Sequence, residues 1–127
     1  MPVPTDTHHQ GRVVAGTDEA DLVAADITVS AGWGTSPTVA PASGSKDHRG
    51  RVSITAQATP GANPTVQVTF KRAFASAPFV TVSRGDIVAP TTGVWVVTAR
   101  TTTSFTATFI GTPVAASVYV LDYQAEE

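Results

Sequence analysis

From residue 27 onward, the sequence consists of short runs in which apolar and polar residues alternate, and turn-forming residues separate these runs. Residues 52–56 read VSITA and residues 66–70 read VQVTF. Alternation with a period of two, rich in β-branched and aromatic residues, predicts a β-strand. Proline and glycine in the intervening segments, such as PGANP at 60–64, predict turns. Further strands are expected at 27–29, 79–83, 94–99, 105–110 and 118–123.

Strands that recur every ~12–14 residues between turns are typical of an antiparallel β-sandwich. We therefore predict an all-β fold, an antiparallel β-sandwich of about six to eight strands. The length of 127 residues is that of one domain. Charged residues make up only 14% of the chain, a composition that suits strands and turns better than long helices.

The composition excludes several classes of protein. The chain has no cysteine, so disulfides and thiolate-ligated metal sites are excluded. No run approaches the ~18 continuous apolar residues of a membrane span. The first residues, MPVPTDTHHQGR, lack the apolar core of a signal peptide, so we expect synthesis and assembly in a cytoplasm.

The chain divides into two parts, an extended N-terminal arm at 1–26 and a β-sandwich domain at 27–127. Prolines and glycines interrupt the first 20 residues, although 18–24 could form one short helical turn. Residues 1–26 carry five acidic side chains against Arg12, and residues 46–100 carry seven basic side chains against two acidic ones. Either the acidic arm lies on a basic body, its own or a neighbour's, or these charges are scattered and solvated.

The later strands are apolar on both faces, at 94–97 and at 118–121. An antiparallel sheet with one face in water would carry polar residues on that side. The second apolar face is covered either by loops of the same chain or by identical subunits, and we expect an oligomer. Trp95, Tyr119 and Leu121 are the candidates for an inter-subunit face.

The stretch TFKRAFASAPFVTVSRGD at 69–86 joins two predicted strands through a cationic corner. Pro78 would turn the chain into the second strand, with Lys71 and Arg72 on the outside of the corner. A partner contact through Lys71 and Arg72 is the alternative interpretation. The residues expected to form the hydrophobic core are Val68, Phe70, Val80, Val82, Phe105 and Phe109.

Several of these segments together form a pattern that resembles a known family. RVSIT at 51–55, APFVTVS at 77–83 and TTTSFT at 101–106 are joined by GWG at 32–34 and SGSKDHRG at 43–50 upstream. This pattern, over about 30–123, resembles a β-sandwich domain of virion surface proteins of tailed phages, especially phages of actinobacteria. It also resembles the H-type lectin fold, a six-stranded antiparallel sandwich that trimerises. Lectin contact residues do not align, so sugar binding is not implied.

The resemblance implies a structural virion protein that forms a homotrimer. We expect a decoration or minor capsid protein on the particle surface, whose N-terminal arm reaches the major capsid protein or a neighbouring subunit. The alternative is a tail fibre or minor tail protein tip that binds a host receptor or glycan. Sugar sites present aromatic faces, and Trp33, between two glycines, is the candidate for an exposed one.

Two groups of residues include side chains of catalytic or metal-binding types. Residues 45–49, SKDHR, hold a serine, an acid and a histidine, but consecutive loop residues rarely converge as a catalytic triad must, so a hydrogen-bonded turn is expected. Asp6, His8 and His9 include metal-ligand types, but adjacent histidines on an extended chain point to opposite sides. We expect no enzyme activity, no metal, no cofactor and, given a net charge of −2 without aromatic interleaving, no nucleic-acid partner.

Overall fold

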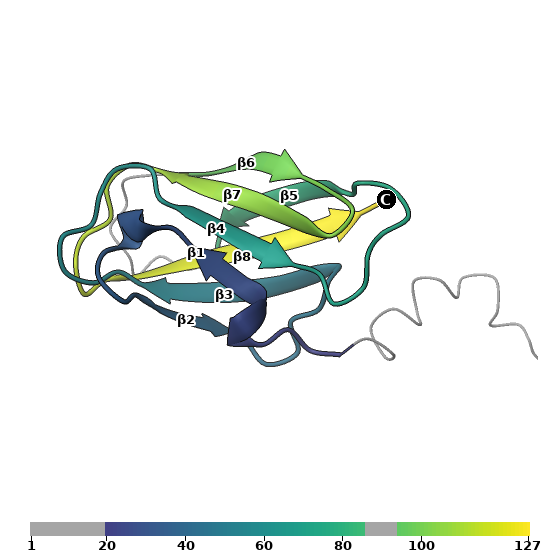
Figure 1. Cartoon of the computed structure of the whole chain (residues 1–127), viewed down its shortest axis with the longest axis horizontal. Helices are drawn as coiled ribbons and strands as arrows, with labels where there is room; N and C mark the ends of the chain where they lie inside the picture. Colours follow the sequence, from purple (N-terminus) through teal and green to yellow (C-terminus); the bar gives the residue numbers. More distant parts are fainter. Residues whose placement is uncertain (1–19, 86–93) are drawn as a thin grey trace, which may run out of the picture.

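The computed structural model of the chain describes residues 20–85 and 94–127, which form two four-stranded antiparallel sheets packed face to face (Figure 1). The all-β antiparallel sandwich expected from the alternating runs is confirmed. Sheet A contains, in order across the sheet, β1 (Ile27–Val29), β4 (Thr65–Thr69), β7 (Ser104–Ile110) and β6 (Val94–Arg100). Sheet B contains β2 (Thr38–Pro41), β3 (Arg49–Thr55), β8 (Val118–Glu126) and β5 (Phe79–Arg84).

Seven of these strands coincide with alternating runs of the sequence, whereas β2 does not. The segment TVAP of β2 contains a proline and only two apolar side chains besides it, so it has no readable period. It lies at the edge of sheet B, where it pairs only with β3. In the described residues, helical structure is limited to two 3-10 turns, η2 (Ala24–Asp26) and η3 (Ala31–Trp33).

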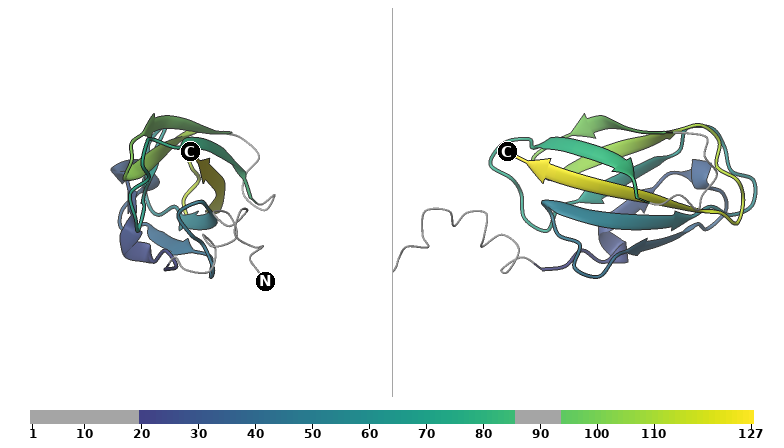
Figure 2. Two further views of the ribbon diagram at one scale, coloured as in Figure 1. Left: turned by 90° about the vertical axis from the view of Figure 1, so that its right-hand side faces the viewer. Right: turned by 180° about the vertical axis from the view of Figure 1, so that it is seen from behind.

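The two sheets face each other in the view along the long axis (left panel of Figure 2), and the hydrophobic core is formed by side chains of both sheets. Aromatic rings fill its centre: Trp33 lies with its ring centroid 5.9 Å from that of Trp95 and 5.6 Å from that of Tyr119. Phe109 packs edge-on against Tyr119, with centroids 4.9 Å apart. Offset and edge-to-face geometries such as these add to the burial of apolar area.

Most of the predicted core is confirmed. The four members on central strands or directly after one are buried, whereas Val80 and Val82 are partly buried and pack against the margin of the core. Both valines lie on β5, which is an edge strand of sheet B and has a neighbour on one side only. The four buried members are Val68, Phe70, Phe105 and Phe109.

The strands that are apolar on both faces turn the larger side chains inward. Trp95, Tyr119 and Leu121 are buried within the core of a single chain, so the expectation that they form an inter-subunit face is wrong. The smaller side chains Val94 and Val118 point outward and are exposed. Alternation shows that a strand has two faces, but it does not show which face is buried. Here the aromatic rings occupy the core because they have the most apolar area to bury.

Residues 20–26 lie on the sandwich. The side chain of Leu22 is part of the hydrophobic core, and its backbone N–H donates to the carbonyl of Ser45 at 2.9 Å. The packed body therefore begins before residue 27, where composition placed the start of the domain. The predicted helical turn at 18–24 is replaced, within the described residues, by η2, where Val23 N–H donates to Oδ2 of Asp26 at 2.9 Å. None of the helices in the described residues is long and apolar enough to span a membrane.

Candidate functional site

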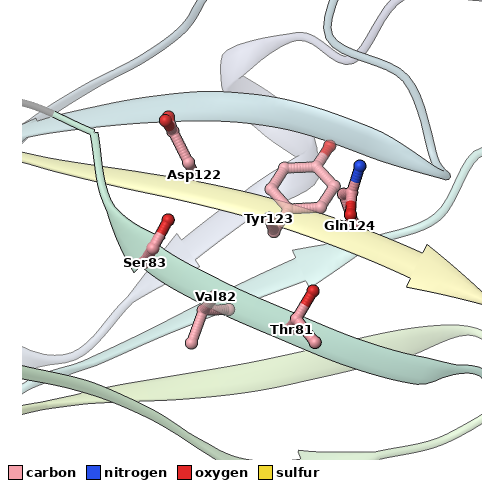
Figure 3. A pocket seen from close by; sticks show the side chains of 6 residues that line it. All are labelled: Thr81, Val82, Ser83, Asp122, Tyr123 and Gln124. Atoms are coloured by element: carbon pink, nitrogen blue, oxygen red, sulfur yellow. The ribbon is translucent and has the colours of Figure 1, made fainter.

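The outer face of sheet B carries two depressions, one on either side of the central strand β8. A depression of about 390 Å³ lies over β5 and β8, and Figure 3 shows the hydroxyls of Thr81 and Ser83 beside Asp122 and Gln124. A second, of about 470 Å³, lies over β3 and β8 and is bounded by the loop 42–45. Both are lined by Asp122, Tyr123 and Gln124, so β8 is the ridge between two parts of one polar surface.

An ion pair stands at the middle of this surface. Arg51 on β3 lies opposite Asp122 on β8, and its guanidinium donates from Nε to Oδ1 at 2.7 Å and from Nη2 to Oδ2 at 2.9 Å. The two side chains remain 50% and 33% exposed. Two parallel bonds fix both groups in direction, although an exposed pair of this kind contributes only about 0–1 kcal/mol to stability.

A glycine lies close beside this pair. A Cβ atom on Gly85, just after β5, would lie 2.4 Å from Oδ1 of Asp122 and 2.6 Å from Cγ1 of Val120. The backbone N–H of Gly85 donates to the carbonyl of Val120 at 3.1 Å. The chain at Gly85 therefore lies close against β8 at Val120 and Asp122.

The surface offers hydroxyl, amide, carboxylate and guanidinium groups on rigid strands, which suits a ligand rich in hydroxyl or amide groups. The depressions are shallow, and their polar side chains come from β3, β5, β8 and the loop 42–45. Across residues 20–85 and 94–127, no three His, Cys, Asp or Glu side chains gather as metal ligands would. The pair Asp6 and His8, with His9, lies outside the described residues.

The serine and acid of the SKDHR loop bind backbone groups. Ser45 Oγ accepts from the N–H of Arg51 at 3.1 Å and donates to its carbonyl at 3.2 Å. The carboxylate of Asp47 accepts from the N–H of Lys71 at 2.7 Å and from that of Arg72 at 3.0 Å. Both side chains are buried, so this loop holds turns together, as expected from the sequence.

The cationic corner is therefore anchored from beneath by Asp47. The residues Lys71 and Arg72 are exposed on it, and Lys71 Nζ lies 2.9 Å from Oδ2 of Asp26. The side chain of Lys46 likewise bonds Asp21. Two acids of the N-terminal part thus lie on basic residues of the same chain, which is one of the two arrangements that the charge asymmetry suggested.

These contacts lower the pKa of both acids. The hydrogen bond from Lys46 and its charge hold the pKa of Asp21 below its usual 3.8. Burial raises the pKa of Asp26, but the Val23 N–H together with Lys71 lower it by more, so the net pKa also lies below 3.8.

Trp33 is fully buried, so the expectation of an exposed ring for sugar stacking is wrong. Its Nε1 donates to the carbonyl of Thr65 at 3.0 Å. The flanking glycines serve close packing: Gly34 has φ +100°, and a Cβ there would lie 2.5 Å from the carbonyl oxygen of Gln57. A Cβ on Gly32 would lie 2.9 Å from Cβ of Pro64. A glycine beside an aromatic residue indicates either an exposed loop or close packing of the backbone, and here the backbone is closely packed.

The residues Thr81, Ser83, Asp122 and Gln124 were not singled out from the sequence. Their signal was present as polar residues at alternate positions of β5 and β8. What the sequence does not contain is the pairing of β8 with both β3 and β5, which brings these positions onto one surface.

Comparisons with protein-family models, with curated proteins and with solved structures find no match for this chain.

Proposed function

We propose that this chain is a structural virion protein of a tailed bacteriophage, a homotrimeric decoration or minor capsid protein on the particle surface. The observation that carries the proposal is the chemical difference between the two outer faces of the sandwich. Sheet B presents a charged, hydrogen-bonding surface centred on Arg51 and Asp122, and sheet A presents an almost uncharged one. A module with two unlike faces is suited to holding two unlike partners.

The sequence resemblance to phage virion surface domains supports the same reading. The segments that carry it form β3, β5 and β7, the loops before them and the end of η3, so they belong to the framework of the sandwich. In this proposal the residues before Ala20 contact the major capsid protein or a neighbouring subunit. The localisation that follows is the assembled particle.

The test uses density-purified particles of the phage that encodes the chain. Mass spectrometry of these particles should find the chain at many copies per particle, and a chain starting at Ala20 should be expressed and folded but no longer incorporated. Absence of the chain from purified particles would contradict the proposal. Incorporation of the shortened chain at the normal level would contradict the anchoring role of its N-terminal residues.

A second function, binding of a host receptor or surface glycan at a tail tip, is favoured by the two depressions beside β8. Saccharides are recognised through hydroxyl groups, which the depressions can bind through Arg51, Asp122 and Gln124. Binding to host cell-wall preparations should be reduced by Gln124→Ala. The matched control is Gln67→Ala, which removes the same amide from the outer face of sheet A. Absence of binding to every host envelope preparation would exclude this function.

A further inference from the structure

Charged residues are distributed unequally between the two sheets. The four strands of sheet A contain one charged residue, Arg100. The four strands of sheet B contain five, which are Arg49, Arg51, Arg84, Asp122 and Glu126. An antiparallel sheet whose outer face meets water usually carries charges there, which keep the protein soluble and discourage association.

Arg100 does not place its charge on the outer face of sheet A. Its Nη1 donates to the carbonyl of Pro78 at 2.9 Å, and its Cζ lies 5.2 Å from the ring centroid of Phe79. Both partners lie on or beside β5, which belongs to the other sheet. The guanidinium therefore bridges the two edge strands β5 and β6 and leaves the face of sheet A uncharged.

Exposed aliphatic residues are grouped on this uncharged face. Val94 on β6 is 57% exposed and lies opposite Ile110 on β7, which is 43% exposed. Val96, also 43% exposed, lies opposite Thr108. The side chains between them, Trp95 and its partner on β7, point into the core, so these four residues form one continuous outer patch. We call this the β6–β7 patch.

The hydroxyl of Thr98, beside the patch, and that of Thr108, within it, are partners within the sheet. Oγ1 of Thr98 lies 3.0 Å from Oγ1 of Thr108 and 3.4 Å from the carbonyl oxygen of Thr106. A hydroxyl that already has a partner costs less to bury than an unpaired one, and much less than a charge. The face of sheet A can therefore be covered without leaving a charged group unpaired.

We propose that copies of this chain associate through the outer face of sheet A, with the β6–β7 patch at the centre of the contact. A second copy is the occupant because two uncharged, β-branched faces meet without any unpaired charge on either side, whereas a charged partner would lose hydration without gaining a counter-charge. The expected number of subunits, three, rests on the proposed function. The inference adds the surface through which the subunits contact one another.

The area of the outer face of sheet A determines how strongly two copies are expected to associate. Four strands about 4.8 Å apart and three to seven residues long cover roughly 350 Å² in projection. A stable complex buries about 800 Å² per partner, so this face supplies about half of that before its neighbouring loops are counted. Association is therefore expected to depend on protein concentration.

The first test is light scattering on the full chain over a concentration series, with a monomer mass of 13.1 kDa. The wild-type chain should form a defined oligomer that Val96→Glu converts to monomer, since the substitution buries a charge in the contact. Val96→Thr should retain association. The matched control Thr81→Glu places the same charge at an exposed outward position of sheet B and should retain it too. Circular dichroism checks that each variant is folded.

A second measurement does not depend on a disruptive charge. The chain has no cysteine, so Val96→Cys and Thr81→Cys each introduce one thiol. The rate of maleimide labelling at position 96 should fall several-fold as the protein concentration rises, and the rate at position 81 should stay constant. A wild-type chain that is monomeric at all concentrations, or an oligomer in which position 81 alone is protected, would overturn the proposal.

The stoichiometry separates this inference from the proposed function. Three subunits protected at position 96 support both. Two subunits protected there support the surface and contradict the trimer. Association through this face together with absence of the chain from purified particles supports the surface and contradicts the virion role.

Discussion

Oδ1 of Asp47 accepts a hydrogen bond from the backbone N–H of Lys71 at 2.7 Å, 24 positions along the chain. The second carboxylate oxygen accepts from the next N–H, that of Arg72, at 3.0 Å. A buried acid thus holds the corner that joins β4 to the segment before β5. The side chains of the two cations do not hold this corner, since that of Lys71 pairs with Asp26, and the group that fixes the corner, Asp47, lies in a different loop.

Removal of Asp47 should destabilise the fold. Asp47→Ala leaves two backbone N–H groups at a buried site without an acceptor, at a cost of about 1–3 kcal/mol each, so we expect a loss of about 3 kcal/mol in the free energy of unfolding. Urea denaturation followed by tryptophan fluorescence measures it. The control Asp122→Ala breaks an exposed ion pair and should cost no more than about 1 kcal/mol. Equal costs for the two variants would show that the corner does not depend on Asp47.

Trp33→Ala should unfold or severely destabilise the protein. The indole fills the centre of the core and donates to the carbonyl of Thr65, and removing a buried tryptophan typically costs about 3–5 kcal/mol. Phe79→Ala is the matched control, because that ring is 71% exposed and its removal should cost less than about 1 kcal/mol. Thermal unfolding compares the two. A stable Trp33→Ala protein would argue against the buried position of this ring.

The point at which the packed body begins can be measured with two shortened chains. A chain starting at Ala20 keeps Leu22 and both acid–lysine pairs, so it is the reference for the contribution of residues 20–26. A chain starting at Ile27 loses the buried leucine, worth about 2 kcal/mol, and should unfold at a lower temperature. Equal stability of the two shortened chains would show that residues 20–26 are dispensable for folding.

Acid should weaken the attachment of residues 20–26. Because the pKa values of Asp21 and Asp26 are lowered in the folded state, their stabilising effect is present above pH 3.8 and is lost as the pH falls below it. Asp26→Asn should therefore be less stable than the wild type at pH 6, and the difference should shrink below pH 3.8. Salt should reduce the difference as well. A difference that grows on acidification would contradict the lowered pKa of Asp26.

The alternation in the sequence determined seven of the eight strands and most of the core, because the period of a strand and its preference for β-branched and aromatic residues are local properties. It also showed that the later strands have two apolar faces. It did not show which face is inside. Alternation is symmetric between the two faces, and only packing against the other sheet placed Trp95 inside and Val94 outside.

The tertiary structure alone decided which residues distant in the sequence become neighbours. Arg51 and Asp122 are 71 positions apart and meet because β3 and β8 pair in one register. The stability of that register comes from contacts across the whole sheet and cannot be inferred from the sequence of either strand alone. The same holds for Trp33, whose neighbouring glycines predict an exposed loop. In the structure these glycines instead pack closely against Pro64 and Gln57. Local periods belong to the sequence, whereas long-range pairing and burial arise only when the sheets pack together.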